Sequence, residues 1–285
     1  MIPSPFDYEA PTTVEEAVAL LGAAGDREVK VLAGGQSLLP VLRLRLAAPD
    51  LLVDLGRIEG LRGVRDDGDA IVVGAMTTHD DVVREPLVRQ HALLLAETAQ
   101  TVADPQIRHR GTFGGSLAHA DPAGDLGAAA LALGAEMVIA GPGGRRTVPG
   151  GEFFTDLFTT AVGEGELLVE VRVPKHTGWG ARYEKFSRVA QAWSIVAVAA
   201  TVRVEGGTIA EARVGLTNMG VSPVRAHGVE RALVGAPATA DAVRQAAAAA
   251  AEGTSPMSDA NADDAYRRHL ATVLTGRAVL AAAGA

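Results

Sequence analysis

The stretch Val29–Ser37 reads VKVLAGGQS, an apolar strand that runs directly into a pair of glycines. Glycine adopts positive φ readily and leaves backbone N–H groups accessible, which suits a turn that cradles phosphate oxygens. Ser37 would begin a short helix, and Leu51–Leu55 follows as a second apolar strand. The stretch therefore predicts a small βαβ-like unit with a phosphate-binding turn. The plainer alternative is a tight strand-to-helix turn.

A second glycine-rich segment, predicted to be a loop, covers Gly111–Ser116 and reads GTFGGS. It places two hydroxyl groups beside two glycines. Asp121 and Asp125 follow at the start of an expected helix, where an acid either caps the helix or accepts from a sugar hydroxyl. Neither segment matches the dinucleotide pattern G-x-G-x-x-G or the P-loop. Two separate glycine pairs favour one ligand held between two subdomains.

Composition narrows the function classes. The chain has 285 residues and a formal net charge of −8, which argues against a broad nucleic-acid surface. It contains no cysteine, so this chain holds no disulfide, thiolate nucleophile or cysteine-ligated iron–sulfur cluster. No secretory signal or transmembrane segment is visible, which predicts a cytoplasmic protein. No spacing of His, Asp and Glu indicates a metal site.

The periodicity predicts an α+β chain. Residues 12–24 read as a helix with capping-box spacing at its start, and Asp67-Gly68 marks a hairpin. The C-terminal part changes from strands at 182–186, 195–204 and 208–216 to helices at 226–233, 239–251 and 264–282. We expect an N-terminal domain over residues 1–176, with subdomains at about 1–57 (small α/β) and 58–176 (central α+β). A C-terminal antiparallel sheet with helices would occupy residues 177–285.

Several motifs in order resemble the FAD-binding medium subunit of molybdenum hydroxylases, the family of aerobic carbon monoxide dehydrogenase and xanthine dehydrogenase. The resemblance covers nearly the whole chain. The motifs that carry it are Ala33–Ser37, Ile107-Arg108, Thr112–Ser116, Ala118–Asp125, Gly165–Leu168 with Val173-Pro174, Tyr183–Phe186 and Asp264–Leu270.

The resemblance implies a site for non-covalently bound FAD. Its diphosphate would be held mainly by backbone N–H groups of both glycine segments, and Asp125 would bond the flavin's sugar-alcohol portion. Leu168 and Lys185 would lie against or near the isoalloxazine, although Lys185 also reads as a surface residue. Trp193 would stack on the ring or be a core aromatic. The implied set is Ala33, Gly34, Gly35, Gln36, Ser37, Thr112, Phe113, Gly114, Gly115, Ser116, Asp125, Leu168, Lys185 and Trp193.

Three positions depart from the carbon monoxide dehydrogenase pattern. Gln36 stands where the family usually has His, Ser116 stands where it usually has Asn, and Trp193 lies where a Gly-Asp-Tyr-Ala context is usual. The first two replacements keep hydrogen-bonding capacity. Together they argue against naming carbon monoxide as the substrate.

The resemblance also implies the assembly. A large subunit would carry the molybdenum cofactor, and a small subunit two [2Fe–2S] clusters. FAD on this chain would pass electrons to an external acceptor, and the complex would be a dimer of heterotrimers, cytoplasmic or at the inner face of the membrane. No catalytic residue is then required in this chain. The alternatives are a stand-alone flavoprotein oxidase or reductase and a flavin-less scaffold subunit.

Overall fold

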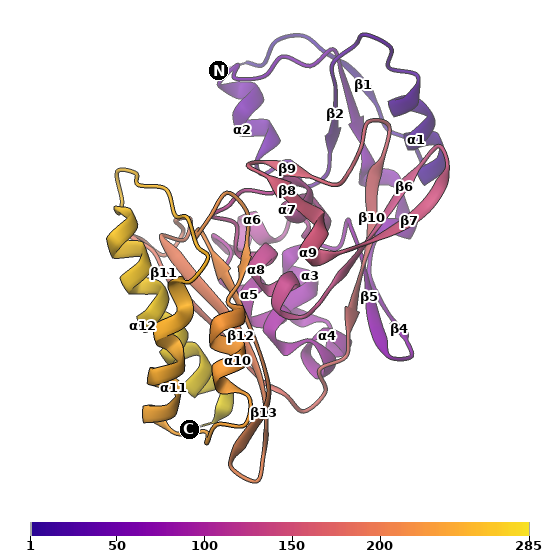
Figure 1. The fold of residues 1–285 in the computed structure, drawn as a ribbon. Helices are drawn as coiled ribbons and strands as arrows, with labels where there is room; N and C mark the ends of the chain where they lie inside the picture. The colour runs from indigo at the N-terminus through magenta and orange to yellow at the C-terminus, as the bar shows by residue number, and fades with distance from the viewer. Residues whose placement is uncertain (1, 285) are drawn as a thin grey trace.

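The computed structural model describes residues 2–284, and Figure 1 shows a small N-terminal lobe above a larger body. The lobe holds a parallel three-stranded sheet in the order β1-β3-β2. Thr13 caps α1 by accepting from the N–H of Glu16 at 3.1 Å, as the capping-box spacing predicted. The predicted βαβ-like unit is confirmed as β2, α2 and β3. Its elements are β1 (Asp7–Glu9), α1 (Val14–Gly22), β2 (Val29–Leu32), α2 (Leu38–Arg43) and β3 (Leu51–Asp54).

The body begins with a five-stranded antiparallel sheet in the order β4-β5-β10-β6-β7. The predicted hairpin at Asp67-Gly68 joins β4 to β5. The strands are β4 (Val64–Asp67), β5 (Ala70–Gly74), β6 (Glu136–Gly141), β7 (Gly144–Pro149) and β10 (Leu167–Pro174). Short 3₁₀ turns lie at η1 (Leu55–Arg57) and η2 (Glu59–Leu61), and a small hairpin is formed by β8 (Phe154–Asp156) and β9 (Thr159–Thr160).

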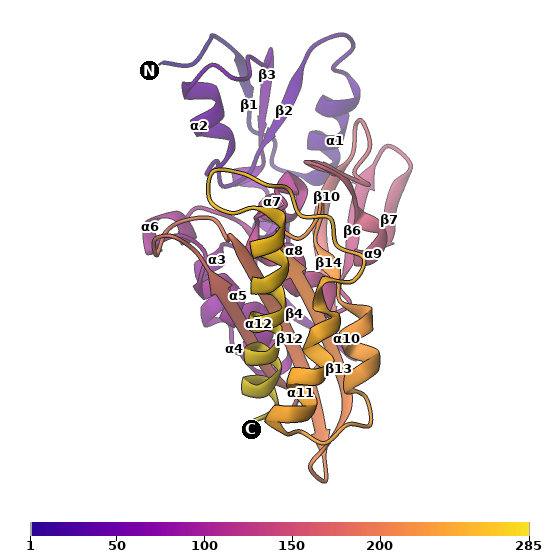
Figure 2. The same ribbon diagram turned by 60° about the vertical axis from the view of Figure 1, so that its left-hand side comes forward.

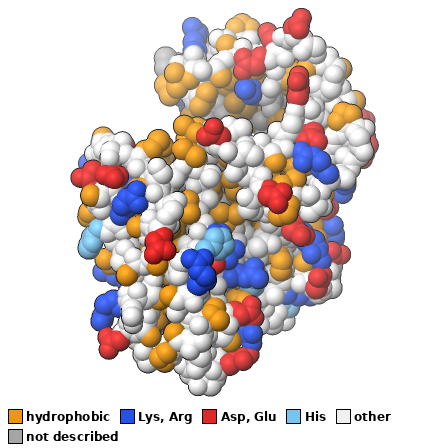
Figure 3. Space-filling model, in the orientation of Figure 1, with side chains coloured by type: hydrophobic (Ala, Val, Ile, Leu, Met, Phe, Trp, Pro, Cys, Tyr) orange, Lys and Arg blue, Asp and Glu red, His pale blue; other side chains and the backbone are white. Residues whose placement is uncertain are grey.

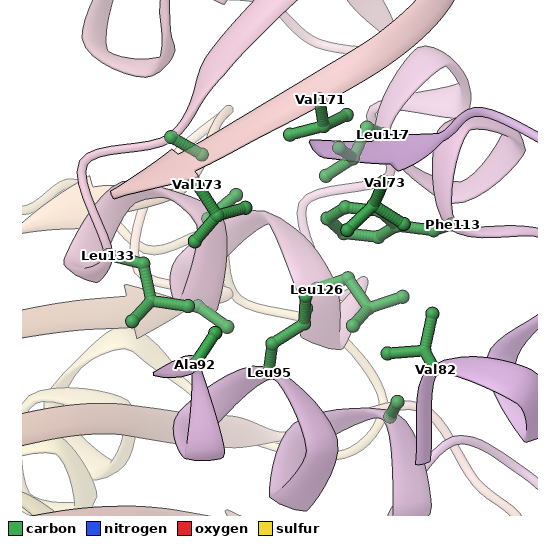
Figure 4. Close-up of a cluster of buried hydrophobic side chains, with 14 of the residues drawn as sticks. Val73, Val82, Ala92, Leu95, Phe113, Leu117, Leu126, Leu133, Val171 and Val173 are labelled. Atoms are coloured by element: carbon green, nitrogen blue, oxygen red, sulfur yellow. The ribbon is translucent and has the colours of Figure 1, made fainter. Parts of the chain in front are cut away.

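Helices cover one face of this sheet and bury the main core. Figure 4 shows Val73, Val171 and Val173 facing side chains of the helices, among them Leu95 and Leu126. Such burial contributes about 25 cal/mol per Å² of apolar surface removed from water. The helices of this layer are α3 (His79–Arg84), α4 (Pro86–His91), α5 (Leu93–Gln100), α6 (Pro105–Arg108), α7 (Phe113–His119), α8 (Asp125–Ala132) and α9 (Gly150–Phe153).

The C-terminal part adds an antiparallel sheet in the order β11-β12-β13-β14. One face of that sheet packs on α5 and α8, and Figure 2 shows α10, α11 and α12 against the other face. The elements are β11 (Gly180–Phe186), β12 (Val196–Glu205), β13 (Thr208–Thr217), β14 (Val224–Arg225), α10 (His227–Leu233), α11 (Ala240–Ala247), η3 (Ala248–Ala251) and α12 (Asp264–Ala283). The body is thus layered as sheet, helices, sheet, helices. This confirms the predicted fold class.

One sequence-based expectation about local structure is wrong. The predicted loop at Gly111–Ser116 is, from Phe113 onward, the first turns of helix α7. Glycine is a poor helix former, at about 1 kcal/mol worse than alanine, so the sequence pattern favoured a loop. The helix forms because Thr112 caps it and because Phe113 and Leu117 are anchored in the main core.

Figure 3 shows a notch between the N-terminal lobe and the body, with hydrophobic side chains along its lower edge. The lobe is fixed to the body by a separate core cluster. In that cluster Val14 and Val53 of the lobe pack with Leu61, Leu167 and Val169 from the body. In Figure 1 the end of β2 points toward the body. The two glycine segments meet there, because a Cβ on Gly34 would overlap the backbone of Arg110 and Gly111.

Candidate cofactor site

The first glycine segment holds a row of backbone donors that the chain itself does not use. Gly35 has φ +78°, a left-handed conformation that residues with a side chain rarely adopt. Within residues 2–284, the backbone N–H groups of Gly34, Gly35, Gln36 and Ser37 have no hydrogen-bond acceptor. Successive N–H groups in such a turn form an anion-binding concavity. This segment therefore fits a phosphate-bearing ligand.

The second glycine segment is built differently, because its backbone donors are used inside the chain. The N–H of Phe113 donates to Thr77 O and that of Gly114 to Ala75 O, both at 2.9 Å. Gly115 N–H donates to the Thr112 hydroxyl at 3.1 Å, and Ser116 N–H to Thr112 O at 3.0 Å. Thr112 is 4% exposed and its hydroxyl caps α7, so what residues 112–116 offer a ligand is chiefly the hydroxyl of Ser116, in place of the expected N–H groups.

The two segments touch, and glycine permits the contact. A Cβ atom on Gly34 would lie 2.1 Å from the carbonyl oxygen of Arg110, and one on Gly115 would lie 3.2 Å from Cβ of Ala33. Gly114 is required for another reason, since a Cβ there would lie 2.5 Å from the side chain of Ala75. The structure thus brings together the two stretches that the sequence suggested hold one ligand.

Asp125, at the first position of α8, is the centre of a buried polar network. Its Oδ1 accepts from the Tyr183 hydroxyl at 2.7 Å and from the Ser194 hydroxyl at 2.6 Å. Its Oδ2 accepts from Lys185 Nζ at 2.8 Å, and the side chains of Asp125 and Lys185 are 5% and 9% exposed. Lys185 is therefore not the solvated surface residue that the sequence left open.

Tyr183 completes this network from within the core. Its hydroxyl also lies 3.4 Å from the hydroxyl of Thr217, which is fully buried. Burial, together with the negative charge of Asp125, raises the pKa of Tyr183 well above its ordinary value. The phenol therefore stays protonated and acts as a donor to Asp125. Sequence reasoning singled out neither Tyr183 nor Ser194, because an alternating strand pattern does not reveal which polar residue meets an acid from another element.

The two apolar residues of the expected set lie in different surroundings. Leu168 belongs to β10 and is buried in the main core. Trp193 is 56% exposed, which rules out the reading of it as a core aromatic. It lines a pocket of about 530 Å³ between the segment that follows α7 and the loop before β12, together with Asp121, Ser194 and the buried Arg267. A larger hollow of about 620 Å³ lies between α1 and the β6–β7 turn and includes neither glycine segment.

His79 was also missed by the sequence reasoning. Its ring lies behind the second glycine segment, because a Cβ on Gly111 would lie 2.8 Å from Cδ2 of this histidine. His79 is 4% exposed, and its Nδ1 has no hydrogen-bond partner within residues 2–284. Burial, assisted by the positive charge of Arg108, lowers the pKa of His79 to about 4. The imidazole is therefore neutral at pH 7.

Two negative findings hold for the part of the chain that the structure describes. No group of three His, Cys, Asp or Glu side chains in residues 2–284 is arranged to bind a metal ion. None of the helices in the same range combines the length and apolar character needed to cross a bilayer.

Comparison with known proteins adds the family context. Residues 4–176 match the family model described as the FAD binding domain in molybdopterin dehydrogenase, and residues 181–282 match the CO dehydrogenase flavoprotein C-terminal domain. The chain is 43% identical over 285 residues to the carbon monoxide dehydrogenase medium chain of Hydrogenophaga pseudoflava, covering 99% of this chain and 98% of that one. It is 36% identical to the 6-hydroxypseudooxynicotine dehydrogenase complex subunit alpha of Paenarthrobacter nicotinovorans, covering 97% and 94%.

The fold is also shared with a solved structure of this family. A solved structure of carbon monoxide dehydrogenase from Hydrogenophaga pseudoflava superposes with a TM-score of 0.95 at 44% identity, covering 99% of this chain and 98% of that chain. That structure lacks the Mo-pyranopterin moiety of the molybdenum cofactor.

Proposed function

This chain belongs to the family of FAD-binding medium subunits of molybdenum hydroxylases, and from that membership we propose which of its residues hold FAD. As a member it is an FAD-carrying electron-transfer subunit of an oxidoreductase with several subunits. The molybdenum cofactor and the iron–sulfur clusters belong to other subunits. FAD, when bound, supplies the redox chemistry, while the protein supplies binding, orientation and electrostatics.

The four acceptor-free N–H groups of Gly34–Ser37 carry the proposal for the diphosphate. Backbone donors that no internal acceptor uses are available to phosphate oxygens without rearrangement. Residues 112–116 would complete the site from the other side, with the hydroxyl of Ser116 as donor, Thr112 capping the helix and Phe113 anchoring it in the core. Ala33 would keep the two segments in register through its contact with Gly115.

Asp125 and Lys185 would serve the flavin end of the site. Asp125 accepts hydrogen bonds, so the part of FAD that suits it is a hydroxyl of the sugar-alcohol portion. Lys185 would hold that carboxylate and bring a positive charge near the ring. Leu168 would line this end from the core side. Trp193, exposed beside the 530 Å³ pocket, would cover one face of the ring.

The larger assembly is proposed on the same basis. A chain without cysteine cannot itself hold cysteine-ligated clusters, so we propose a small subunit with [2Fe–2S] clusters as the electron donor and a large molybdenum subunit as the site of substrate oxidation. We also propose a dimer of heterotrimers, an external electron acceptor, and a position in the cytoplasm or at the inner face of the membrane. The relatives' names refer to different substrates, which supports a substrate pocket outside this chain.

Flavin content tests the proposed site. The complex isolated with this chain should show the visible absorption of oxidised flavin. Gly34→Ala should lose the flavin, because the new methyl group would meet the Arg110 carbonyl and separate the two segments. Gly60→Ala is the matched control, because a Cβ there meets no atom within 4 Å.

A milder variant keeps the test informative if Gly34→Ala fails to fold. Ser116→Ala leaves the packing intact and should weaken FAD binding about tenfold, the order expected for a hydrogen bond to a charged group. A folded complex without flavin would refute the proposed function. Normal flavin content in both Gly34→Ala and Ser116→Ala would exclude these segments as the diphosphate site.

A further inference from the structure

The two carboxylate oxygens of Asp125 accept different numbers of hydrogen bonds. An ionised carboxylate has about four acceptor positions, two on each oxygen. Oδ1 accepts from Tyr183 at 2.7 Å and from Ser194 at 2.6 Å, so both of its positions are used. Oδ2 accepts only from Lys185, at 2.8 Å. One acceptor position therefore remains, and it is on Oδ2.

The donors to Oδ1 come from a different part of the fold than Asp125 itself. Asp125 begins α8, whereas Tyr183 lies in β11 and Ser194 in the loop before β12. Both donors are themselves held: Tyr183 is buried beside Thr217, and Asn218 donates from Nδ2 to the backbone carbonyl of Ser194 at 2.8 Å. The C-terminal sheet thus fixes the rotation of a carboxylate that belongs to the FAD-binding domain.

We propose that Tyr183 and Ser194 are positioning residues for FAD. By occupying Oδ1 they turn Asp125 so that Oδ2 presents its one open acceptor position to a hydroxyl of the flavin's sugar-alcohol chain. The inference rests on the proposed function, since it takes FAD as the ligand of this site. Every buried acid needs hydrogen-bond donors. The proposed role of Tyr183 and Ser194 goes beyond that need, because they also set the orientation of the carboxylate.

The test measures how strongly the protein recognises individual hydroxyls of FAD. The complex is stripped of flavin and titrated with FAD and with analogues that each lack one hydroxyl of the sugar-alcohol chain. For the wild-type complex, one analogue should bind about tenfold or more weakly than FAD, as expected for a lost hydrogen bond to a charged acceptor. In Tyr183→Phe and Ser194→Ala, FAD should bind more weakly, and the difference between FAD and that analogue should shrink to about threefold or less.

Control variants separate positioning from stability. Tyr266→Phe and Ser255→Ala make the same chemical changes at exposed positions whose hydroxyls do not bond to the network, and they should keep the wild-type preference for FAD. Ser194→Thr retains the hydroxyl and should keep that preference. Ser194→Ala keeps the test usable if Tyr183→Phe does not fold. A purely structural role for the two donors would alter thermal stability but leave the ratio of the two affinities unchanged.

Each outcome bears on a separate claim. A wild-type complex that retains no FAD overturns the proposed function, and the inference falls with it. A wild-type complex that binds FAD and every analogue equally well overturns the inference alone. Equal discrimination in the wild type, Tyr183→Phe and Ser194→Ala overturns the positioning role and leaves Asp125 as a direct contact.

Discussion

Single residues around the site owe their identity to different constraints. Gly34 gives room for the Arg110 carbonyl, Gly35 holds a left-handed turn, and Gly114 packs on Ala75. Only the first two belong to the row of free donors. A substitution at Gly114 would therefore act first on folding, and its effect on FAD would follow from that.

His79 makes a pH prediction at the residue scale. Its pKa is about 4 in the folded chain and about 6.5 when unfolded, so between these values only the unfolded chain binds the proton. This contribution to stability is complete above pH 6.5 and is lost as the pH falls toward 4. At about 1.4 kcal/mol per pH unit, His79 should account for roughly 2 kcal/mol of stability lost between pH 7 and pH 5.

Urea unfolding of the wild type and His79→Gln at both pH values measures this loss. The variant removes the titration, so its stability should change less between the two conditions than that of the wild type. The comparison separates the effect of His79 from the charge of Arg108 and from the His109–Asp80 pair, which are the same in both proteins. An equal change in both proteins would show that the pKa of His79 is not lowered in the folded chain.

At the scale of elements, one ion pair joins α8 to β11. Lys185→Met would leave the Asp125 carboxylate buried without a positive partner, which costs about 3–5 kcal/mol in comparable cases. Lys175→Met is the control, because Lys175 Nζ pairs at 2.7 Å with Asp66, whose side chain is half exposed. Such a pair contributes about 0.2–1 kcal/mol.

Thermal and urea unfolding of the flavin-free protein compare the two lysine variants. Adding Asp125→Asn to Lys185→Met should recover part of the loss, since the buried charge is then removed. If Lys185→Met is no more destabilising than Lys175→Met, the Lys185–Asp125 ion pair between α8 and β11 does not stabilise the fold.

For the whole molecule, the two glycine segments approach a common ligand from different parts of the fold, and they differ in how firmly the fold holds them before the ligand binds. The first segment lies on a lobe fixed to the body by its own cluster of apolar residues. The second begins a helix that is anchored in the main core. FAD binding should therefore order the first segment much more than the second.

Hydrogen exchange with and without FAD measures this asymmetry. The amides of Gly34, Gln36 and Ser37 should exchange rapidly without FAD and slow markedly when it is added, because they are partly exposed and have no acceptor within residues 2–284. The amides of Phe113–Ser116 should be protected in both states. The β4–β5 turn at Asp67-Gly68 serves as an unaffected reference. Protection that appears only in the second segment would contradict the proposed division of roles.

The sequence by itself determined the order of elements, the α+β class and the family. Strand periodicity, the Thr13 cap and the Asp67-Gly68 turn act within a few residues, so they can be read without the fold. The paired glycines likewise indicated one ligand between two subdomains. Local patterns of this kind also led to the wrong loop at Gly111–Ser116, because the helix there depends on distant partners for Phe113 and Leu117.

Only the tertiary structure decided which groups are free to act. Whether a backbone N–H is available depends on acceptors elsewhere in the chain, and Ala75 and Thr77 use those of the second segment. The partners of Asp125 likewise come from residues far along the sequence, brought together when the C-terminal sheet packs on α8. Hydrogen-bond satisfaction and burial are properties of the packed chain, so the first glycine segment, Tyr183 and Ser194 acquire their distinct roles only in the fold.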